Sequence, residues 1–469
     1  MKGMTLRAMT EAVNGIYHGN GEDYDKEITA ITIDSRKVAE GGLFIAIKGE
    51  RSDGHDFIGQ CFEKGAACVI SEKKLPDEGH SYIQVKSSLQ ALKDLALLYR
   101  NNLDVKVVGI TGSVGKTSTK ETISSVLSEK YRVLKTLGNF NNEIGLPLTV
   151  FRLTEDDEVA VLEMGISDFG EMERLSKIAQ PDICVITNIG LCHLENLGTR
   201  DGILKAKTEI FNHMNPDGIV ILNSDDDKLS TISQVHGKRP LVFGISNKDG
   251  VYADNIKSLG LDGTSFTIHG IKTADNYSTF DLTVPVPGHH MVYNAMAAAL
   301  VGSVLGLSSI EIERGVKNLK TIAGRNNIIK ENSFTIIDDC YNANPVSMKA
   351  SLDVLDTAIG RKVAILGSMF ELGENEKQMH YDVGMYLGTK DIDVLITAGD
   401  LAAQIAAGTR AYIEDNYNAH GCEVHDYATR DDMLKCIGQI LKKGDNILIK
   451  ASHGMEFGKV VEAVKIINI

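Results

Sequence analysis

The sequence predicts an α/β protein of three domains: a small N-terminal α/β domain, a central domain with a P-loop ATPase-like parallel sheet and helices, and a C-terminal Rossmann-like domain. Three observations favour this fold class. The chain has 469 residues, more than one hydrophobic core usually serves. Short β-branched runs alternate with amphipathic stretches along most of its length. A glycine loop ending in Gly-Lys-Thr lies between an apolar run and a helical pattern.

The first domain is expected over residues 1–101. Short apolar runs predict four strands, and leucines at helical spacing predict a helix that stops at the Asn101-Asn102 pair. The expected strands are Ile28–Ile33, Leu43–Ile47, Ala67–Ile70 and Tyr82–Val85, and the helix runs through Leu89, Leu92, Leu95 and Leu98.

The central domain is expected over residues 102–324. Buried parallel strands alternate with helices, and the pattern turns β-rich over Thr264–Val286 before it returns to helix. The segment Met291–Leu307 is apolar, but it is short for a membrane span and carries Asn294, so we expect a buried helix. The other strands are Val159–Met164, Ile183–Thr187 and Ile219–Leu222, with helices near Phe169–Ala179, Gly202–Phe211 and Glu311–Lys320.

The third domain is expected over residues 325–469, where strand and helix repeat as in a doubly wound sheet. Linkers near residues 102 and 324 would let the outer domains close on the central one. The expected strands are Thr335–Asp339, Lys362–Leu366, Val394–Thr397, Glu423–Asp426 and Ile447–Lys450.

Composition narrows the function classes. A net charge of −14 argues against sequence-independent nucleic-acid binding, which needs a basic surface. The seven cysteines are odd in number, scattered and never in Cys-x-x-Cys, which predicts reduced thiols in a cytoplasmic protein. The first residues show no apolar leader segment.

The glycine loop predicts a phosphate site. Backbone amides of such a loop turn toward phosphate oxygens, the lysine reaches the terminal phosphates, and the threonine hydroxyl can ligate Mg²⁺. The loop is shorter than the common Walker A form, because Ile110 stands where the first glycine is expected. A chance Gly and Lys pair in a surface turn is the alternative, and the flanking strand and helix argue against it. The candidate residues are Gly112, Ser113, Val114, Gly115, Lys116, Thr117 and Ser118.

Two strand ends extend this candidate site. Glu163 ends an apolar strand, where α/β sheets place ligands, so it is either a Walker B-type metal ligand or an ordinary strand-terminal glutamate. His193 follows another strand; a lone His is usually structural, but this position makes a second metal plausible. Nothing in composition singles out Lys207. The run Asp225-Asp226-Asp227 lacks the spacing of a calcium loop and is interpreted as a solvated turn.

Together these segments resemble the Mur ligases, the ATP-dependent amide-forming enzymes of bacterial cell-wall synthesis. The likeness covers essentially the whole chain in the family's three-domain order. It rests on Thr111–Thr117, Glu163-Met-Gly, Thr187–His193, Ala206-Lys207-x-Glu209 and Pro287–Ala298.

Within the family, Asp338–Ser347 is most similar to the branch that adds D-alanyl-D-alanine to UDP-N-acetylmuramoyl-tripeptide, because siblings carry Tyr-Ala-His there. Leu137–Pro147 and Asp34–Phe44 also fit, although siblings share versions of both. One departure is visible: the usual Lys-Gly-Ser-Arg is Lys450-Ala-Ser-His453 here, so a contact expected of that Arg is in question.

The resemblance implies a mechanism. The tripeptide carboxylate takes the γ-phosphate of ATP to give an acyl phosphate, and the amine of D-alanyl-D-alanine then displaces phosphate. By resemblance, Lys116 contacts the β- and γ-phosphates, Thr117 and Glu163 hold one Mg²⁺, and His193 holds a second. Lys207 would be the family's carbamylated lysine, a metal ligand in that form. Asn294, Arg325 and Asp339 would hold adenine, phosphate and ribose respectively.

The resemblance also implies substrate contacts. Ser35 and Arg36 should face the UDP-sugar, and a set of asparagines with one tyrosine should position the peptides. That set is Asn139, Asn141, Asn142, Tyr341, Asn342 and Asn344. We expect a cytoplasmic monomer that neither inserts into a membrane nor binds nucleic acid.

Three alternatives stay open from the sequence: a sibling ligase that adds a single amino acid, a P-loop nucleotide switch without ligase activity, and a small-molecule kinase. The third residue of the acceptor peptide is either diaminopimelate or lysine.

Overall fold

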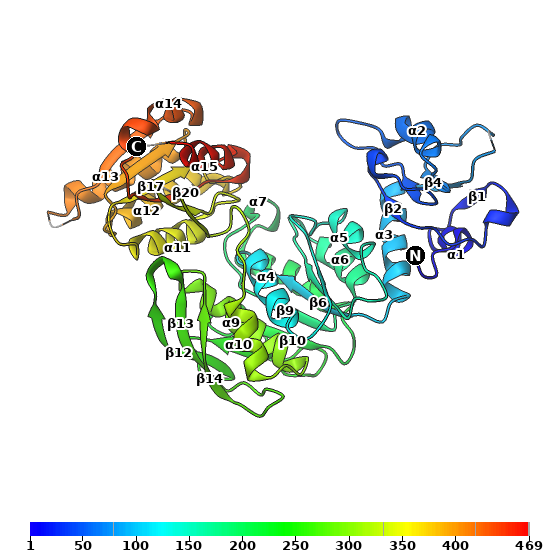
Figure 1. The fold of residues 1–469 in the computed structure, drawn as a ribbon, viewed down its shortest axis with the longest axis horizontal. Helices are drawn as coiled ribbons and strands as arrows, with labels where there is room; N and C mark the ends of the chain where they lie inside the picture. The colour runs from blue at the N-terminus through cyan, green and yellow to red at the C-terminus, as the bar shows by residue number, and fades with distance from the viewer. Residues whose placement is uncertain (78, 332, 418, 468–469) are drawn as a thin grey trace. The chain divides into compact units, whose positions relative to one another are not determined.

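The computed structural model describes residues 1–77, 79–331, 333–417 and 419–467. The chain forms two compact units. One unit comprises Met1–Thr111, Tyr131–Val185 and Ala206–Val220, and the other comprises Gly112–Lys130, Ile186–Lys205 and Ile221–Ile469. Three sheets, of five, nine and six strands, follow one another along the sequence (Figure 1). The predicted α/β class is confirmed.

The N-terminal sheet has the strand order β1-β5-β4-β3-β2, and only β1 is antiparallel to its neighbour. Strand β2 covers Ile31–Thr32, which is shorter than the expected range Ile28–Ile33. The sequence did not predict β1, because this strand has three residues and its first residue, Ile16, is 63% exposed. The elements are α1 (Leu6–Ala12), β1 (Ile16–His18), β2 (Ile31–Thr32), β3 (Leu43–Ile45), α2 (Ile58–Glu63), β4 (Cys68–Ser71), β5 (Tyr82–Gln84) and α3 (Ser88–Asn101).

The nine-stranded sheet has the order β14-β13-β12-β11-β10-β9-β6-β8-β7. Strands β6, β7 and β8 pair in parallel, as do β10, β11 and β12, which confirms the predicted parallel sheet. The β-rich region expected near its end is an antiparallel extension made by β12, β13 and β14. The strands are β6 (Lys106–Thr111), β7 (Val133–Lys135), β8 (Val159–Glu163), β9 (Ile183–Ile186), β10 (Ile219–Asn223), β11 (Leu241–Gly244), β12 (Val251–Ser258), β13 (Thr264–His269) and β14 (Thr279–Val284).

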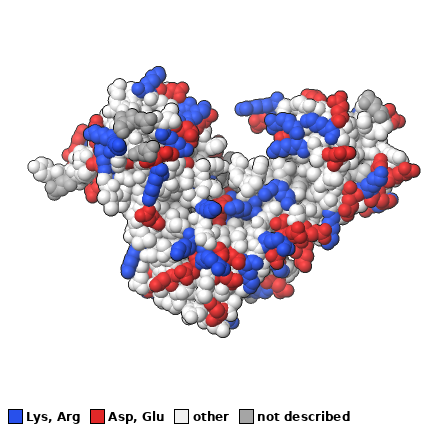
Figure 2. Space-filling model, in the orientation of Figure 1, with Lys and Arg blue, Asp and Glu red and all other residues white. Residues whose placement is uncertain are grey.

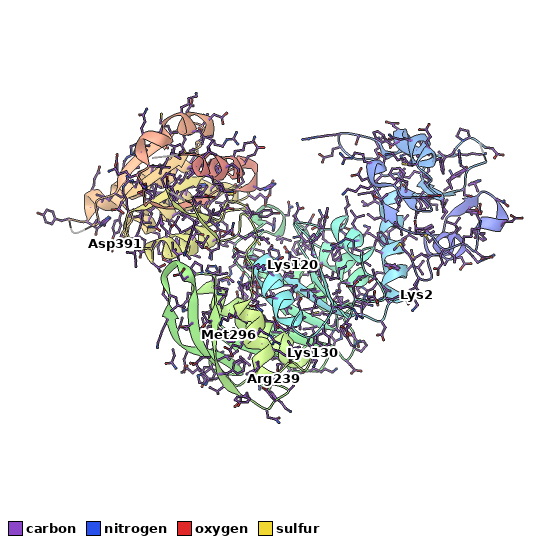
Figure 3. The ribbon with its side chains drawn as sticks, in the orientation of Figure 1. Lys2, Lys120, Lys130, Arg239, Met296 and Asp391 are labelled. Carbon is purple, nitrogen blue, oxygen red and sulfur yellow. The ribbon has the colours of Figure 1, made fainter. Side chains whose placement is uncertain are left out.

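Helices around this sheet follow the predicted amphipathic stretches. The helix α9 is buried along almost its whole length, with Met296 fully covered (Figure 3), so the apolar segment is a core helix as predicted. Its close neighbours are α4 and α10. No described helix is long and apolar enough to cross a bilayer. The helices are α4 (Lys116–Leu127), α5 (Gly145–Val150), α6 (Glu171–Ala179), α7 (Leu194–Leu197), α8 (Arg200–Thr208), α9 (His290–Val304) and α10 (Ser309–Lys317).

The C-terminal sheet is doubly wound, as predicted, with the order β15-β16-β20-β17-β18-β19. One face packs on α14 and α15 and the other on α11, α12 and α13, each through its own apolar cluster (Figure 1). The elements are β15 (Asn327–Lys330), β16 (Thr335–Asp338), α11 (Pro345–Asp356), β17 (Lys362–Gly367), α12 (Glu376–Gly388), β18 (Val394–Ala398), α13 (Ala402–Asp415), β19 (Glu423–Tyr427), α14 (Arg430–Ile440), β20 (Asn446–Lys450) and α15 (Gly458–Lys465).

The cysteine side chains match the expectation of free thiols. All seven cysteines are free thiols, and burial raises the pKa of Cys68 to about 12, which keeps that thiol protonated and unreactive. On the face drawn in Figure 2, acidic and basic side chains are mixed over most of the surface.

The interpretation of Asp225-Asp226-Asp227 as a solvated turn is wrong for its first two residues. Asp225 accepts hydrogen bonds from the amides of Ile245, Ser246 and Asn247, at 2.6, 3.0 and 2.7 Å. Its carboxylate also accepts the Tyr293 hydroxyl at 2.8 Å. Asp226 accepts the Ile189 amide at 2.7 Å. The run therefore fixes loops that follow neighbouring strands, and only Asp227 is exposed.

Replacing Asp225 by Ala should destabilise the fold, because three amides and the Tyr293 hydroxyl lose their acceptor. We expect the free energy of unfolding to fall by about 2 kcal/mol in urea titrations. The matched control is Asp227→Ala, which removes only an exposed pair with Arg200 and should cause no measurable change.

The effect of Asp225 should also depend on pH. Burial raises the pKa of Asp225, but the three amides and Tyr293 outweigh it, so the net pKa lies below its ordinary value. The carboxylate therefore stabilises the fold fully above about pH 4, and this stabilisation is lost as pH falls through the folded-state pKa. An unchanged gap between wild type and variant at pH 2 would contradict this account.

Candidate functional site

The glycine loop is sterically fixed against the segment that follows β9. Gly112 has φ +152°, and a Cβ there would lie 1.9 Å from Thr187 Oγ1. Gly115 has φ +82° and caps α4. Only glycine fits the first position, because any side chain would overlap Thr187.

Hydrogen bonds hold the same two segments together. The amides of Ser113 and Val114 donate to the carbonyl and side-chain oxygens of Asn188, each at 3.0 Å. Thr187 Oγ1 donates to the Val114 carbonyl at 2.7 Å. These two amides are used inside the protein, so the groups left for the predicted anion are the first turn of α4 and Lys116. Lys116 Nζ donates to the Gly112 carbonyl at 2.7 Å and so bends back over the loop.

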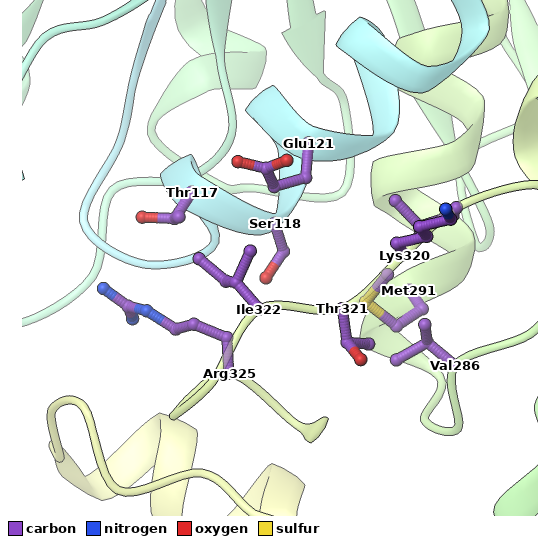
Figure 4. Close-up of a pocket in the computed structure, with 10 residues that line it drawn as sticks. Thr117, Ser118, Glu121, Val286, Met291, Lys320, Thr321, Ile322 and Arg325 are labelled. Atoms are coloured by element: carbon purple, nitrogen blue, oxygen red, sulfur yellow. The ribbon is translucent and has the colours of Figure 1, made fainter. Parts of the chain in front are cut away.

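A pocket opens beside this loop (Figure 4). The first turns of α4 provide polar groups, the start of α9 and the residues before it provide apolar ones, and the segment after α10 closes the side. The lining residues are Thr117, Ser118, Glu121, Val286, Met291, Leu319, Lys320, Thr321, Ile322 and Arg325.

Helix α4 carries two buried charged residues next to the pocket. Lys120, labelled in Figure 3, is 1% exposed, and its Nζ lies 3.1 Å from Glu121 Oε1. Glu121 itself lines the pocket. The ion pair keeps a carboxylate at the wall of the pocket, where it can accept a hydrogen bond from a ligand.

Arg325 reaches this pocket from the segment that leads into the C-terminal sheet (Figure 4). Its Cζ lies 3.9 Å from the centroid of the Tyr341 ring. The His453 ring packs near the same tyrosine, with centroids 5.2 Å apart. The buried Arg325 Nε has no hydrogen-bond partner among the described residues. A cation with an unused donor at a pocket wall suits an anionic ligand.

Two residues predicted for the nucleotide already have partners within the protein. The side chain of Asn294 does not line the pocket; its Oδ1 accepts the Thr119 hydroxyl at 2.9 Å. Asp339 accepts Lys450 Nζ at 2.5 Å and the Ser351 hydroxyl at 2.6 Å. Their roles toward adenine and ribose stay predictions.

Glu163 is buried at the end of β8, as the sequence predicts. Asn141 Nδ2 donates to Glu163 Oε1 at 2.8 Å, and the Glu163 amide donates to Thr136 Oγ1 at 3.0 Å. Asn141, predicted to contact the peptide, is thus a residue that orients this carboxylate.

The predicted basic ligands differ in exposure. Lys207 on α8 is 1% exposed, an expensive place for an ammonium group. His193 is 28% exposed, has φ +50°, and its Nδ1 lies 3.3 Å from Glu371 Oε2. Such a left-handed backbone in a non-glycine residue is a mark of functional segments.

The remaining predicted contacts fall into structural and exposed positions. Asn344 caps α11 through the Ser347 amide at 2.8 Å, and Asn142 Oδ1 accepts the Gly145 amide at 2.9 Å. Asn139 is exposed, and Asn342 Oδ1 accepts the Ala343 amide. In the N-terminal domain Ser35 lies in a short turn, and Arg36 is paired with Asp34 at 2.9 Å.

Comparison with known proteins decides the family. Three domain models match: "Mur ligase family, catalytic domain" over residues 27–100, "Mur ligase middle domain" over 110–302, and "Mur ligase, glutamate ligase domain" over 324–453. A Bacillus subtilis protein named UDP-N-acetylmuramoyl-tripeptide–D-alanyl-D-alanine ligase is 40% identical over 463 residues, covering 98% of this chain and 97% of its own. The chain belongs to the Mur ligase family. The resemblance inferred from the motifs is confirmed.

Solved structures support this membership in the Mur ligase family. A crystal structure of MurF from Acinetobacter baumannii has a TM-score of 0.87 at 31% identity and covers 98% of each chain. MurF ligase from Thermotoga maritima in complex with ADP has a TM-score of 0.80 at 31% identity, covering 93% of this chain and 97% of its own.

Some residues of this Mur ligase site were missed in the sequence. Glu121 and Met291 line the pocket. From the sequence alone, Glu121 resembles a solvated charge on a helix and Met291 resembles part of an apolar helix. Asn188 and Lys450 each stand at or just beyond the end of a parallel strand. The strand-end rule that selected Glu163 could have found them too.

The close approach at Gly112 predicts a specific steric effect. Gly112→Ala should lower the free energy of unfolding by about 1–3 kcal/mol in urea titrations, as overpacked substitutions do. It should also weaken binding of inorganic tripolyphosphate, measured by titration calorimetry. The double variant Gly112→Ala/Thr187→Ala should recover part of both losses.

The matched control is Gly59→Ala in α2, where an added Cβ meets no atom within 4 Å. It should leave phosphate binding unchanged. If Gly112→Ala behaves like this control, the loop is not held as described.

Proposed function

We propose that this Mur ligase joins D-alanyl-D-alanine to UDP-N-acetylmuramoyl-tripeptide, using ATP and releasing ADP and phosphate. The observation that carries the proposal is one pocket lined by the phosphate-loop residues Thr117 and Ser118 together with Arg325. The names of relatives in Bacillus subtilis and Escherichia coli, which align over nearly their whole length, support the choice of substrates. The ADP complex of the Thermotoga maritima neighbour supports the choice of nucleotide.

The first step of the reaction brings two anions together. First, a carboxylate oxygen of the tripeptide attacks the γ-phosphorus of ATP, and the bond from that phosphorus to the β-phosphate oxygen breaks to release ADP. The amine of D-alanyl-D-alanine then attacks the acyl carbon, loses a proton and expels phosphate. Lys116 and Arg325 are the cations that would offset charge on the phosphates, and the first-turn amides of α4 would orient them.

The residues present suit Mg²⁺. This ion binds one or two carboxylates and completes its shell with substrate phosphates and water. No three His, Cys, Asp or Glu side chains gather into a metal group over the described ranges. Thr117 and Glu163 would hold one ion, and His193 and Lys207 a second. When bound, Mg²⁺ neutralises phosphate charge.

Carbamylation of Lys207 would resolve the difficulty of a buried lysine near a metal. The neutral amine adds to carbon dioxide, losing a proton, and the product is an anion. A buried anion can orient a metal, whereas a buried ammonium would repel it.

Further assignments follow from the family motifs. Ser35 and Arg36 would contact the UDP-sugar, and Tyr341 and Asn139 would help position the peptides. Asn294 and Asp339 would contact adenine and ribose. The ranges 1–101, 102–324 and 325–469 would bind the UDP-sugar, bind ATP and complete the ligase site respectively, in a cytoplasmic monomer.

Phosphate release tests the proposed function. Purified protein with Mg²⁺, ATP and UDP-N-acetylmuramoyl-tripeptide should release phosphate much faster when D-alanyl-D-alanine is added. Lys116→Ala should abolish this release because the phosphate contact is lost, while the circular dichroism spectrum stays unchanged because the hydrogen bond to the Gly112 carbonyl lies within one loop. An equal rate of phosphate release with and without the dipeptide would favour a nucleotide switch. A phosphorylated product without an amide would favour a kinase.

Lys207 has its own test. Lys207→Ala should be inactive, and short carboxylates such as acetate should restore part of the activity, since they can replace the carbamate anion. The comparison is Lys116→Ala, which the same carboxylates should not rescue. Failure of rescue together with an unmodified Lys207 mass would remove the carbamate from the mechanism.

A further inference from the structure

Two consecutive carboxylates hold the backbone on both sides of Arg325. Asp338 Oδ2 accepts the amide of Gly324 at 2.7 Å, and Asp339 Oδ1 accepts the amide of Asn326 at 3.0 Å. The Tyr341 amide donates a hydrogen bond to the Gly324 carbonyl at 3.1 Å. The one residue between the two clamped amides is Arg325.

Lys450 in turn holds the second carboxylate. This lysine ends β20 with its side chain 2% exposed. Its ammonium donates to Asp339 Oδ2 at 2.5 Å, to the Asp339 carbonyl at 3.3 Å and to the Asn342 carbonyl at 3.1 Å. All its donors are therefore directed at the turn that carries the clamp.

Gly324 fits this arrangement for a steric reason. Its φ is +78°, and a Cβ there would lie 3.1 Å from the Tyr341 Cβ. The Tyr341 ring then lies under the Arg325 guanidinium. Backbone and side chain of Arg325 are thus both set by the same turn after β16.

We propose that Asp338, Asp339 and Lys450 are positioning residues, which act by fixing Arg325 at the pocket rather than by touching the nucleotide phosphates. This inference rests on the proposed function, because it assigns phosphate binding to Arg325. Burial of the Lys450 ammonium costs free energy, and all three of its donors are directed at one turn. Because that turn holds Arg325, the buried lysine contributes to ligand binding.

A double-mutant cycle tests the proposal. Lys450→Met and Asp338→Ala should each weaken binding of both ADP and tripolyphosphate by about tenfold in titration calorimetry, as one lost charge-assisted contact does. In the Arg325→Ala background the same changes should have no further effect, since their target is gone. Equal losses in both backgrounds would overturn the proposal. Loss of ADP binding with unchanged tripolyphosphate binding would also overturn it, because the effect would then not act through the phosphate contact of Arg325.

The matched control is Arg361→Met. Arg361 pairs at 2.8 Å with the buried Asp445, which precedes the same strand β20 at its opposite end. This variant should lose stability as Lys450→Met does, yet bind tripolyphosphate normally. If the control weakens binding equally, the effect of Lys450 is general destabilisation.

Hydrogen exchange of the full-length protein gives a readout that needs no ligand. The amides of Gly324 and Asn326 should exchange at least tenfold faster in Lys450→Met and Asp338→Ala, and unchanged in Arg361→Met. Unchanged exchange in the first two variants would overturn the clamp. If wild type binds no nucleotide but the exchange results appear, the proposed function fails while the clamp stands.

Discussion

The contact between Gly112 and Thr187 constrains the rest of the phosphate site. It brings the loop after β6 against the segment after β9 so closely that only a glycine fits. Asn188 accepts hydrogen bonds from two loop amides, and Asp226 accepts one from the Ile189 amide. A loop fixed in this way presents the start of α4 without reorganising when an anion binds, which is what electrostatic preorganisation requires.

Three of the buried charges among the described residues lie at strand ends or near a helix start. Glu163 ends β8, Lys450 ends β20, and Lys120 lies in the second turn of α4. Each is covered almost completely, and a covered charge is tolerated only with partners. These positions match the edges where parallel sheets place ligands, so the sites of costly burial and of expected chemistry coincide.

Side-chain partners changed the meaning of several predicted contacts. Asn344 is a helix cap, Asn141 orients a carboxylate, and Asp225 is the hub of a loop network rather than a solvated acid. Asparagine and aspartate bind backbone amides as readily as ligands, so a motif that contains them does not say which use applies. Their neighbours in space decide it.

The sequence by itself determined the α/β class, the general alternation of strands and helices, the phosphate loop and the strand-end glutamate, because these depend on periodicity and local spacing. Only the tertiary structure decided that Asn188 takes the amides of the loop, that Glu121 and Arg325 line one pocket, and that Lys450 lies behind Asp339. The physical reason is distance along the chain. Hydrogen bonds join Asn188 to Val114 across 74 positions and Lys450 to Asp339 across 111, and no local pattern records which residues meet.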